Sequence, residues 1–444
     1  MTQEQAKRIL EDCLASWKKS NRATKASLLA QMEAVSFTDF KRMRTLLNGK
    51  ETPAPQPEPS APEVIERLSA AERTDALAAG EAKLRAGEVA VLLVAGGQGS
   101  RLGYEGPKGA YPIGPVSRQP IFYFHARKIV GLASRYGTSI PFYIMTSAAN
   151  DAQTKAHFKA NHYFGLNKDD VIFFQQGVWP ALDDKEGKLI LDAPGHIFMS
   201  PDGHGGTISA LKKSHCLADM ARRGITSVFY FQVDNPLVEI ADPVFIGLHA
   251  LKGADVSLKV CAKRAPEEGL GVVALRDGHS TIIEYTELTR EQAHRKTKDG
   301  ELYFKYGSVA IHVFSLDFLK AEAGRHDLPI HIAHKKIPVC GADGHIVTPD
   351  TPNGYKFEKF IFDVLPHAAK VVNLAFDRAD EFSPVKNKDA DGHDTPATCR
   401  RDMQAKSRRW LAQHGVQVRD DIPVEIDPAY TFSPGDLKDG LRVR

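Results

Sequence analysis

The sequence has few features of secreted, membrane-spanning or nucleic-acid-binding proteins. Only five of its 444 residues are cysteines, these form no CxxC pair, and no run of about 18 apolar residues occurs. The formal net charge of +3 is too small to create the field that attracts nucleic acid or an acidic membrane surface. The first residues also lack the apolar stretch of a signal peptide. These absences predict a cytoplasmic protein without structural zinc and without a nucleic-acid or membrane partner.

The composition indicates a globular chain of more than one domain. Hydrophobic residues make up 42% of the sequence and charged residues 25%. At about 100–200 residues per domain, the length suggests two or three domains. We expect a helical N-terminal region at 1–85 with a Pro-rich linker at 51–64, a catalytic domain at 86–382, and a small C-terminal domain at 383–444.

The N-terminal region shows helical patterning that a proline-rich segment interrupts. Apolar residues such as Leu10, Leu14 and Trp17 recur at helical spacing, which predicts helices in the first 50 residues. The segment ETPAPQPEPSAPEV then places five prolines in fourteen residues, which excludes a continuous helix. A further helix is predicted at 70–85.

From Val89 onward, short apolar runs alternate with longer amphipathic segments. The predicted strands are VAVLLV, IPFYIMT, VIFFQQ, SVFYFQV, DVSLKVCA and VVNLAF, and the predicted helices lie near 120–135, 150–161, 206–222, 243–251 and 357–369. Such alternation favours an α/β fold with a mostly parallel sheet covered by helices on both faces, in which ligands bind beyond the carboxyl ends of the strands. The C-terminal domain is expected to contain short strands in GVQVR and PVEID.

The most informative segment is a glycine-rich loop that follows the first predicted strand. It reads AGGQGSRLGYEGPKG and contains Arg101 and Lys108. Glycines allow several backbone N–H groups to converge on phosphate oxygens, and the two cations can neutralise the remaining negative charge. The segment therefore predicts a phosphate-binding loop.

Two well-known phosphate-binding motifs do not fit this loop. The dinucleotide motif G-x-G-x-x-G needs glycine where Leu102 stands. The P-loop motif needs Ser or Thr after its lysine, but Gly109 follows Lys108. The pattern A-G-G-x-G-[ST]-R-L-G followed by P-K-G instead resembles the signature loop of the sugar nucleotidyltransferases.

Further segments extend this resemblance over roughly residues 90–440. They occur in the order FFQQGVWPAL, SPDGHGGTISAL, FYFQVDNPLVEIADPVFIG, IIEYTEL, YGSVAIHVF, LPIHIAHKKIP, PNGYKFEKFIFDVLP and DEFSPVKNKDADGHDTP. The chain thus resembles the UDP-sugar pyrophosphorylases (UDPGP type 1 family), most of all the eukaryotic-type UDP-N-acetylhexosamine pyrophosphorylases. This resemblance implies a Rossmann-like, GT-A type nucleotidyltransferase core that converts UTP and a sugar 1-phosphate, foremost N-acetylglucosamine 1-phosphate, to a UDP-sugar and pyrophosphate.

The resemblance also implies which residues bind the nucleotide. Arg101 and Lys108 would hold the departing phosphates, and Gln176 would read the edge of uracil. The other implied nucleotide-binding residues are Ala95, Gly96, Gly97, Gly203 and Lys356. Asp234 is expected at this site on chemical grounds as well, because a carboxylate at the end of the apolar run SVFYFQV is suited to hold Mg²⁺.

On the sugar side, the resemblance implies that Glu284 and Tyr285 bind hydroxyl groups and that Lys386 holds the attacking phosphate. Two positions depart from the acetylhexosamine enzymes, which typically carry asparagine where this chain has His204 and Ser308. Histidine in that turn resembles the UDP-glucose and broad-specificity enzymes. N-acetylglucosamine 1-phosphate is therefore the leading substrate, and a UTP–glucose-1-phosphate uridylyltransferase or a broad-specificity UDP-sugar pyrophosphorylase is the alternative.

The expected chemistry is attack by a phosphate oxygen of the sugar 1-phosphate on the α-phosphorus of UTP, with Arg101, Lys108 and Lys386 as the catalytic cations. A non-catalytic nucleotide-sugar-binding protein of the same fold is the alternative from another class. An NAD-dependent dehydrogenase is disfavoured because Leu102 breaks the dinucleotide motif. Monomer and homodimer remain equally open.

Overall fold

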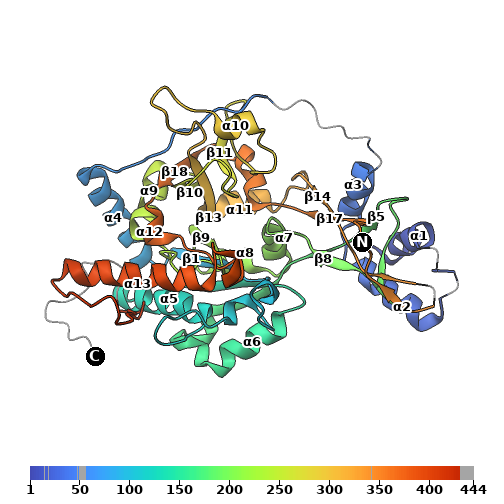
Figure 1. The fold of residues 1–444 in the computed structure, drawn as a ribbon. Coiled ribbons are helices and arrows are strands. Elements are labelled where there is room, and N and C mark those ends of the chain that lie inside the picture. Colours follow the sequence, from blue (N-terminus) through green and yellow to red (C-terminus); the bar gives the residue numbers. More distant parts are fainter. Residues whose placement is uncertain (15, 19, 48, 50–56, 342, 431–444) are drawn as a thin grey trace. The chain divides into compact units, whose positions relative to one another are not determined.

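The computed structural model describes residues 1–430 except 15, 19, 48, 50–56 and 342. The chain folds into two compact units, each assembled from segments far apart in the sequence (Figure 1). The smaller unit comprises Met1–Pro57, Gln176–Ala210 and Gly324–Val364. The larger unit comprises Glu58–Gln175, Leu211–Ala323 and Leu365–Arg444.

The boundaries of these two units differ from those of the three consecutive regions that we expected from the sequence. The three regions remain a prediction. Part of the expected linker (51–56) and the end of the expected C-terminal domain (431–444) lie outside the described residues. Among the residues that are described, no helix combines the length and the apolar character needed to cross a bilayer.

In the described part of the larger unit, nine strands form one sheet. They are β1 (Val89–Val94), β2 (Phe142–Thr146), β3 (Val171–Gln175), β9 (Ser227–Gln232), β10 (Val256–Ala262), β11 (Val272–Arg276), β12 (His279–Ile283), β13 (Tyr306–Ser315) and β18 (Val371–Ala375). The order is β12-β11-β13-β9-β1-β2-β3, and β10 pairs with both β13 and β18.

The sheet is mostly parallel, as the strand–helix alternation predicts. Strands β9, β1, β2 and β3 run parallel to one another, and so do β10 and β18. Strand β13 runs antiparallel to β9 and β10, between which it lies. The six predicted apolar runs all form strands, because a strand buried on both faces of a parallel sheet needs continuous apolar sequence.

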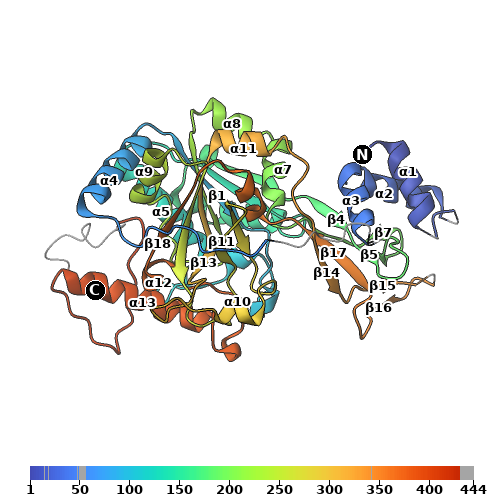
Figure 2. The same ribbon diagram turned by 90° about the horizontal axis from the view of Figure 1, so that it is seen from above.

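Helices cover both faces of this sheet. Phe124 and Phe245 pack in one core with Val91, on the face that α5 (Ile121–Tyr136) and α9 (Pro243–Lys252) cover. Tyr143 points to the opposite face, where its hydroxyl donates to Asp219 (2.6 Å) of helix α8 (Cys216–Arg222). Figure 2 shows α8 beside helix α11 (Leu316–Glu322). The helices of the larger unit are α4 (Ala70–Arg85), α5, α6 (Asp151–Ala160), α8 (Cys216–Arg222), α9, α10 (Arg290–His294), α11 (Leu316–Glu322), α12 (Arg378–Glu381) and α13 (Pro396–Gln413), and α7 (Gly206–Lys213) contains a boundary between the units.

The smaller unit packs three N-terminal helices against short antiparallel strands. The helices are α1 (Gln3–Cys13), α2 (Arg22–Glu33) and α3 (Phe37–Leu47). Leu10, Met32 and Phe40 from these helices share a core with Trp179 and Phe357. The strands are β4 (Val178–Pro180), β5 (Leu182–Asp183), β6 (Leu191–Ala193), β7 (His196–Ile197), β8 (Met199–Pro201), β14 (His331–Lys335), β15 (Val339–Cys340), β16 (Ile346–Val347) and β17 (Gly354–Glu358).

The helix predicted at 357–369 is wrong. Residues Gly354–Glu358 form β17, which pairs antiparallel with β14, and Ile361–His367 form a short 3-10 helix, η5. Pairing with β14 and burial of Phe357 outweigh the local helical pattern. Pro366 lies in η5 and cannot donate to a longer helical ladder.

The strands expected in GVQVR and PVEID are also wrong, since the described residues after α13 contain no strand. The guanidinium of Arg408 donates to the carbonyls of Val418 (3.2 Å), Arg419 (2.9 Å), Asp420 (3.2 Å) and Ile422. One side chain of α13 thus occupies backbone carbonyls that a neighbouring strand would otherwise bind. This segment therefore needs no strand partner for these carbonyls.

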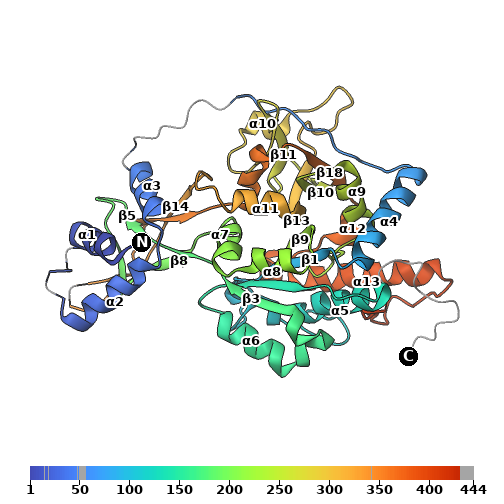
Figure 3. The same cartoon turned by 180° about the vertical axis from the view of Figure 1, so that it is seen from behind.

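Two glycines allow α4 and α9 to lie side by side (Figure 3). A Cβ atom on Gly80 would lie 1.8 Å from the carbonyl oxygen of Pro243, and one on Gly247 would lie 1.7 Å from that of Ala76. Both obstacles are backbone atoms, which cannot move away as a side chain can. The helix pair therefore depends on glycine at both positions.

We expect Gly247→Ala to destabilise the larger unit by at least about 1–3 kcal/mol, the usual cost of overpacking. Alanine raises helix propensity by up to about 1 kcal/mol, but this gain is smaller than the cost of separating the helices. Urea unfolding followed by circular dichroism measures the change. Leu251→Ala is the control, because Leu251 of α9 is 57% exposed and should change the stability by less than about 0.5 kcal/mol. Equal stabilities of the two variants would contradict the prediction.

Candidate functional site

The glycine-rich loop of the larger unit is tightly folded at the carboxyl end of β1. Gly99 N–H donates to Gly106 O (2.9 Å), and Lys108 N–H donates to Gly97 O (3.1 Å). The loop contains two 3-10 turns, η1 (Ser100–Leu102) and η2 (Lys108–Ala110). Between them Gly103 has a φ of 70°, a conformation that favours glycine. The loop is thus a defined structure rather than a simple flexible turn.

Two side chains from the segment after β2 hold the first carbonyls of this loop. Ser147 Oγ donates to Gly96 O (2.8 Å), and Asn150 Nδ2 donates to Ala95 O (2.9 Å) and Gly97 O (3.2 Å). The N–H groups of Gly96 and Gly97 donate to no other residue in the described part of the chain. They are therefore available to an anion.

Arg101 and Lys108 extend from the same loop with unpaired charges. Arg101 is exposed and Lys108 half-buried. Neither forms an ion pair with a carboxylate among residues that the structure describes. Unpaired cations beside free N–H groups suit a phosphate ligand.

Asp234 lies at the adjacent strand end. It follows β9, and Val233 N–H donates to Val94 O of β1 (3.1 Å), so the end of β9 adjoins the start of the loop. From α5, His125 Nε2 contacts Val233 O (3.1 Å), and Lys128 Nζ donates to Pro236 O (2.6 Å). Helix α5 therefore contacts the backbone before and after this half-buried carboxylate.

The backbone beside Asp234 also supports the segment that carries Lys386. Val385 N–H donates to Asp234 O (2.7 Å), and Lys386 N–H donates to Asp394 O (2.7 Å). The Lys386 ammonium lies 5.9 Å from the ring centroid of Phe382 and forms no ion pair within the described part of the chain. The structure thus places Asp234 and Lys386 on paired backbone segments.

Glu284 and Ser308 come together beside Gly271, and the ring of Tyr285 lies beside Gly269. Glu284 follows β12 directly, and a Cβ on Gly271 would lie 3.0 Å from Glu284 Oε1. Ser308 N–H donates to Gly271 O (2.8 Å). Tyr285, the next residue after Glu284, is 51% exposed. The two segments expected to bind the sugar are therefore neighbours.

Ser308 begins a β-bulge in β13. Lys259 of β10 pairs with Ile311, but the next residue, Val260, pairs with Ser308. Ala310 in the bulge has a φ of 58°, which is unusual for a residue with a side chain, and its N–H donates to Ser308 Oγ (3.4 Å). Bulges of this kind are frequent next to active sites, where they redirect a side chain.

The register of β9 and β13 relates the position of Ser308 to that of Asp234. His312 pairs with Tyr230 in this antiparallel ladder. Ser308 lies four residues before His312, and Asp234 lies four residues after Tyr230. Both residues therefore lie at the same edge of the sheet, the carboxyl edge of the parallel strands.

In the smaller unit, Gln176 and Gly203 contact each other. Gln176 Nε2 donates to Gly203 O (2.7 Å). Gly203 has a φ of 83°, and a Cβ there would lie 2.3 Å from Lys359 O. Glycine is thus required at 203 by the approach of the 359 backbone, and its carbonyl orients the amide of Gln176.

His204 forms mainly structural contacts. Its Nδ1 accepts from Ile361 N–H (3.1 Å), and its ring stacks on Phe360 with centroids 5.2 Å apart. Burial, together with the neighbouring His331, lowers the pKa of His204 to about 4. The ring is therefore neutral near pH 7, with Nδ1 as an acceptor and Nε2–H left as the donor.

Lys356 lies on β17 with its ammonium 4.8 Å from the ring centroid of Phe198. Burial lowers its pKa below the usual lysine value, and the neighbouring Glu358 partly opposes this shift. Its ammonium forms no ion pair with a described carboxylate. An unpaired, half-buried cation is costly unless an anion approaches it.

The sequence reasoning missed a buried charge pair beside these residues. Lys359 Nζ lies 3.3 Å from Asp39 Oδ1 and 4.7 Å from the Trp179 ring centroid, and Lys359 N–H donates to Asp202 O. Burial raises the pKa of Asp202 to about 6, against the opposing charge of Lys359. Lys359 follows Phe357 by two residues, so strand alternation could have indicated that it points inward.

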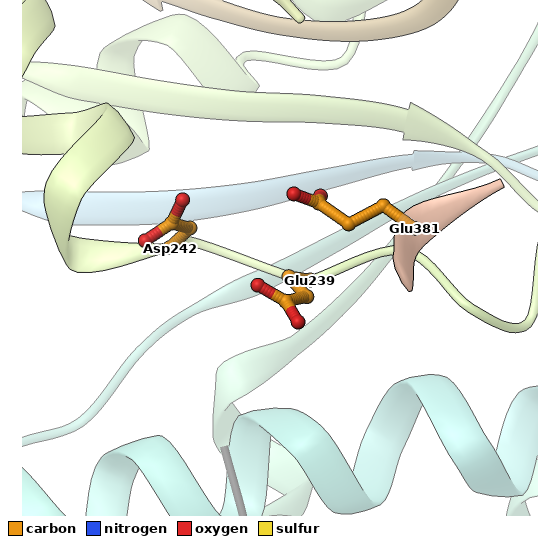
Figure 4. Close-up of side chains that lie close together, drawn as sticks. All are labelled: Glu239, Asp242 and Glu381. Carbon is orange, nitrogen blue, oxygen red and sulfur yellow. The ribbon is translucent and has the colours of Figure 1, made fainter. Parts of the chain in front are cut away.

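An acidic cluster of the larger unit lies apart from Asp234. Glu239, Asp242 and Glu381 bring carboxylate oxygens within 4.8 Å of one another (Figure 4). The buried Lys259 ammonium donates to Asp242 (2.9 Å) and Glu381 (2.5 Å). Burial raises the pKa of Glu381 to about 7, while Lys259 acts to lower it. This cluster already contains its cation and is structural.

Comparison with known proteins places this chain in a family. The family model described as UTP–glucose-1-phosphate uridylyltransferase matches residues 53–421. UDP-N-acetylglucosamine pyrophosphorylase of Saccharomyces cerevisiae is 39% identical over 359 residues, covering 79% of this chain and 75% of that protein. UDP-N-acetylhexosamine pyrophosphorylase-like protein 1 of Mus musculus is 38% identical over 425 residues, covering 90% of this chain and 83% of that protein.

A solved structure is similar over nearly the whole chain. The uridine diphosphate N-acetylglucosamine pyrophosphorylase of Trypanosoma brucei, in complex with an inhibitor, superimposes with a TM-score of 0.84 at 29% identity. The match covers 98% of this chain and 94% of that one. The chain belongs to the UTP–glucose-1-phosphate uridylyltransferase family.

Proposed function

We propose that this protein is a UTP:sugar-1-phosphate uridylyltransferase that acts foremost on N-acetylglucosamine 1-phosphate. One observation in the structure carries the proposal: the loop after β1 presents the free N–H groups of Gly96 and Gly97 beside the unpaired cations Arg101 and Lys108. Asp234 adjoins this loop at the next strand end. Membership in the uridylyltransferase family supports the same reaction.

The reaction transfers uridylate between two phosphates. A phosphate oxygen of the sugar 1-phosphate attacks the α-phosphorus of UTP, a new P–O bond forms, and the bond to the bridging oxygen of the β-phosphate breaks. Pyrophosphate carries the bonding electron pair away. The attacking phosphate is already anionic near pH 7, so no protein nucleophile is required. Catalysis rests on positioning and on neutralisation of charge.

On the nucleotide side, the glycine-rich loop supplies phosphate contacts. Ala95, Gly96 and Gly97 bring the backbone close to the UTP phosphates, and the N–H groups of the two glycines donate to phosphate oxygens. Arg101 and Lys108 stabilise the charge that develops on the departing pyrophosphate. This assignment is supported by the absence of competing carboxylate partners for both cations among the described residues.

Gln176, Lys356 and His204 are assigned further substrate contacts. Gln176, with its amide oriented by Gly203 O, reads the edge of uracil. Lys356 binds a UTP phosphate, which supplies the anion that this half-buried ammonium lacks. The Nε2–H of His204 is the donor that remains on that ring for a substrate oxygen.

On the sugar side, Lys386 holds the attacking phosphate, and Glu284 accepts hydrogen bonds from sugar hydroxyls. Tyr285 provides an exposed ring beside Glu284. Ser308 takes the position near the C2 substituent of the sugar. The neighbourhood of Glu284 and Ser308 around Gly271 supports a shared role for them.

The residues present fit a bound Mg²⁺. Asp234 is a half-buried carboxylate without an ion pair among the described residues, and Mg²⁺ is commonly held by one or two carboxylates together with substrate phosphates and water. When bound, the ion would neutralise charge on the UTP phosphates. Asp234 would be its protein ligand.

We expect Lys108→Ala and Arg101→Ala each to lower kcat about 10²- to 10³-fold, the usual loss for one contact to charge that develops in the transition state. Pyrophosphate release measures turnover, and thermal melting checks the fold. Lys320→Ala is the control, since this lysine lies on α11 and, among the described residues, pairs only with its neighbour Asp317. Near-normal turnover of both loop variants would refute their roles.

We expect activity to require a divalent cation and Asp234→Asn to be severely impaired. The amide keeps the size of the carboxylate but loses the charge that attracts the metal. Turnover is measured with Mg²⁺ and with excess EDTA, and Asp317→Asn is the control because that side chain is 93% exposed. Full activity in EDTA would exclude the proposed cofactor.

The substrate is tested by pyrophosphate release from a panel of nucleoside triphosphates and sugar 1-phosphates. We expect UTP to be required and both N-acetylglucosamine 1-phosphate and glucose 1-phosphate to react. A site without a direct bond to the acetamido group discriminates by only about 1–3 kcal/mol in kcat/KM.

Ser308→Asn should shift the preference toward the acetylated sugar, because it supplies the amide that Ser308 lacks. Ser308→Ala is the matched control and should not produce this shift. Strict wild-type use of either sugar would contradict relaxed selectivity. Binding of a UDP-sugar without any turnover would identify a non-catalytic nucleotide-sugar-binding protein instead.

A further inference from the structure

Two buried asparagines lie directly behind the residues assigned to the two substrates. Asn150 is completely buried, and Asn235 is 4% exposed. Each donates through its side-chain amide to the backbone of a neighbouring segment. Neither belongs to the residues that the proposed function uses.

Asn150 connects the segment after β2 to the phosphate-binding loop. Its Nδ2 donates to Ala95 O (2.9 Å) and Gly97 O (3.2 Å), while its Oδ1 accepts from Ser147 N–H (2.9 Å). Ser147 in turn donates through its hydroxyl to Gly96 O. The carbonyls of three successive residues are thereby bonded to these two side chains, whereas the N–H groups of Gly96 and Gly97 donate to no described residue.

Asn235 connects the end of β9 to the segment that carries Lys386. Its Nδ2 donates to Glu381 O (2.7 Å), and its Oδ1 accepts from Ser383 N–H (3.1 Å). The adjacent Asp234 O accepts from Val385 N–H (2.7 Å). These three bonds hold residues 381–385, directly before Lys386, against the end of β9.

We propose that Asn150 and Asn235 are positioning residues for different substrates, Asn150 for UTP through the glycine-rich loop and Asn235 for the sugar 1-phosphate through Lys386. This inference rests on the proposed function. An amide side chain is suited to hold a backbone segment because it donates hydrogen bonds to carbonyls and accepts one from an N–H group. The backbone of a neighbouring strand does the same. A displacement of about 1 Å in a positioning group can lower the rate about 100-fold.

A third asparagine provides the matched control. Asn373 of β18 is 6% exposed, and its Nδ2 donates to Glu63 O (3.0 Å). It belongs to the same unit and forms the same kind of amide-to-backbone bond. It bonds neither to the glycine-rich loop nor to the segment at 381–386. The Asn373→Ala variant therefore measures how much stability is lost when a buried amide is removed away from the site.

The experiment measures the KM for UTP and for the sugar 1-phosphate in the full-length variants Asn150→Ala, Asn235→Ala and Asn373→Ala. We expect Asn150→Ala to raise the KM for UTP about tenfold or more and Asn235→Ala to raise that for the sugar 1-phosphate similarly, each with less than about a twofold change in the other KM. Asn373→Ala should lower the melting temperature and change neither KM. A smaller folded fraction lowers the apparent kcat but leaves KM unchanged, so a purely structural role cannot produce this pattern.

Three results would overturn the inference. Both KM values could change together in Asn150→Ala and Asn235→Ala, neither could change, or Asn373→Ala could reproduce the shifts. If the alanine variants do not fold, Asn150→Ser and Asn235→Ser keep a hydroxyl that can replace part of the three bonds of Asn150 and the two bonds of Asn235, and they should shift the same KM values by a smaller factor. A wild-type protein that releases no pyrophosphate overturns the proposed function and these substrate assignments with it, whereas an active wild type with unmoved KM values overturns the positioning roles alone.

Discussion

The parallel pairing of β1 with β9 determines where the larger unit can perform chemistry. Both strands end at the same edge, and the bond from Val233 N–H to Val94 O continues their pairing to the last residues. The glycine-rich loop and Asp234 must therefore leave the sheet side by side. A loop that donates to phosphates and a carboxylate that can hold a divalent cation are useful to one substrate only when they adjoin. Register alone brings these two groups together.

A second constraint is that irregular backbone next to a buried sheet needs hydrogen-bond partners. Asn150 and Ser147 provide them for the glycine-rich loop, and Asn235 and Lys128 provide them around Asp234. When these carbonyls are held, the orientation of the adjoining peptide groups, including their N–H groups, is restricted as well. The same bonds that remove the cost of unpaired backbone groups thus shape the surface offered to a phosphate.

The distribution of charge separates structural ion pairs from groups available for binding. Lys259 and Lys359 are buried and paired with carboxylates, so their charges are already compensated. Arg101, Lys108 and Lys386 lie at the carboxyl edge of the sheet without such partners among the described residues. Cationic side chains therefore either form structural ion pairs or remain available to bind an anion. Only the presence or absence of a carboxylate partner distinguishes the two groups.

The sequence by itself determined the parallel core, the position of the glycine-rich loop and the placement of Asp234 after a strand, because continuous apolar runs and glycine clusters are local signals. It did not reveal the strand pairing of 354–358, the bulge at Ser308, or the buried contacts of Asn150, Asn235 and Lys359. Those features depend on which distant segment lies opposite. The sequence does not distinguish a buried asparagine from a solvated one. Whether an asparagine is buried depends on the backbone groups that tertiary packing brings against its side chain.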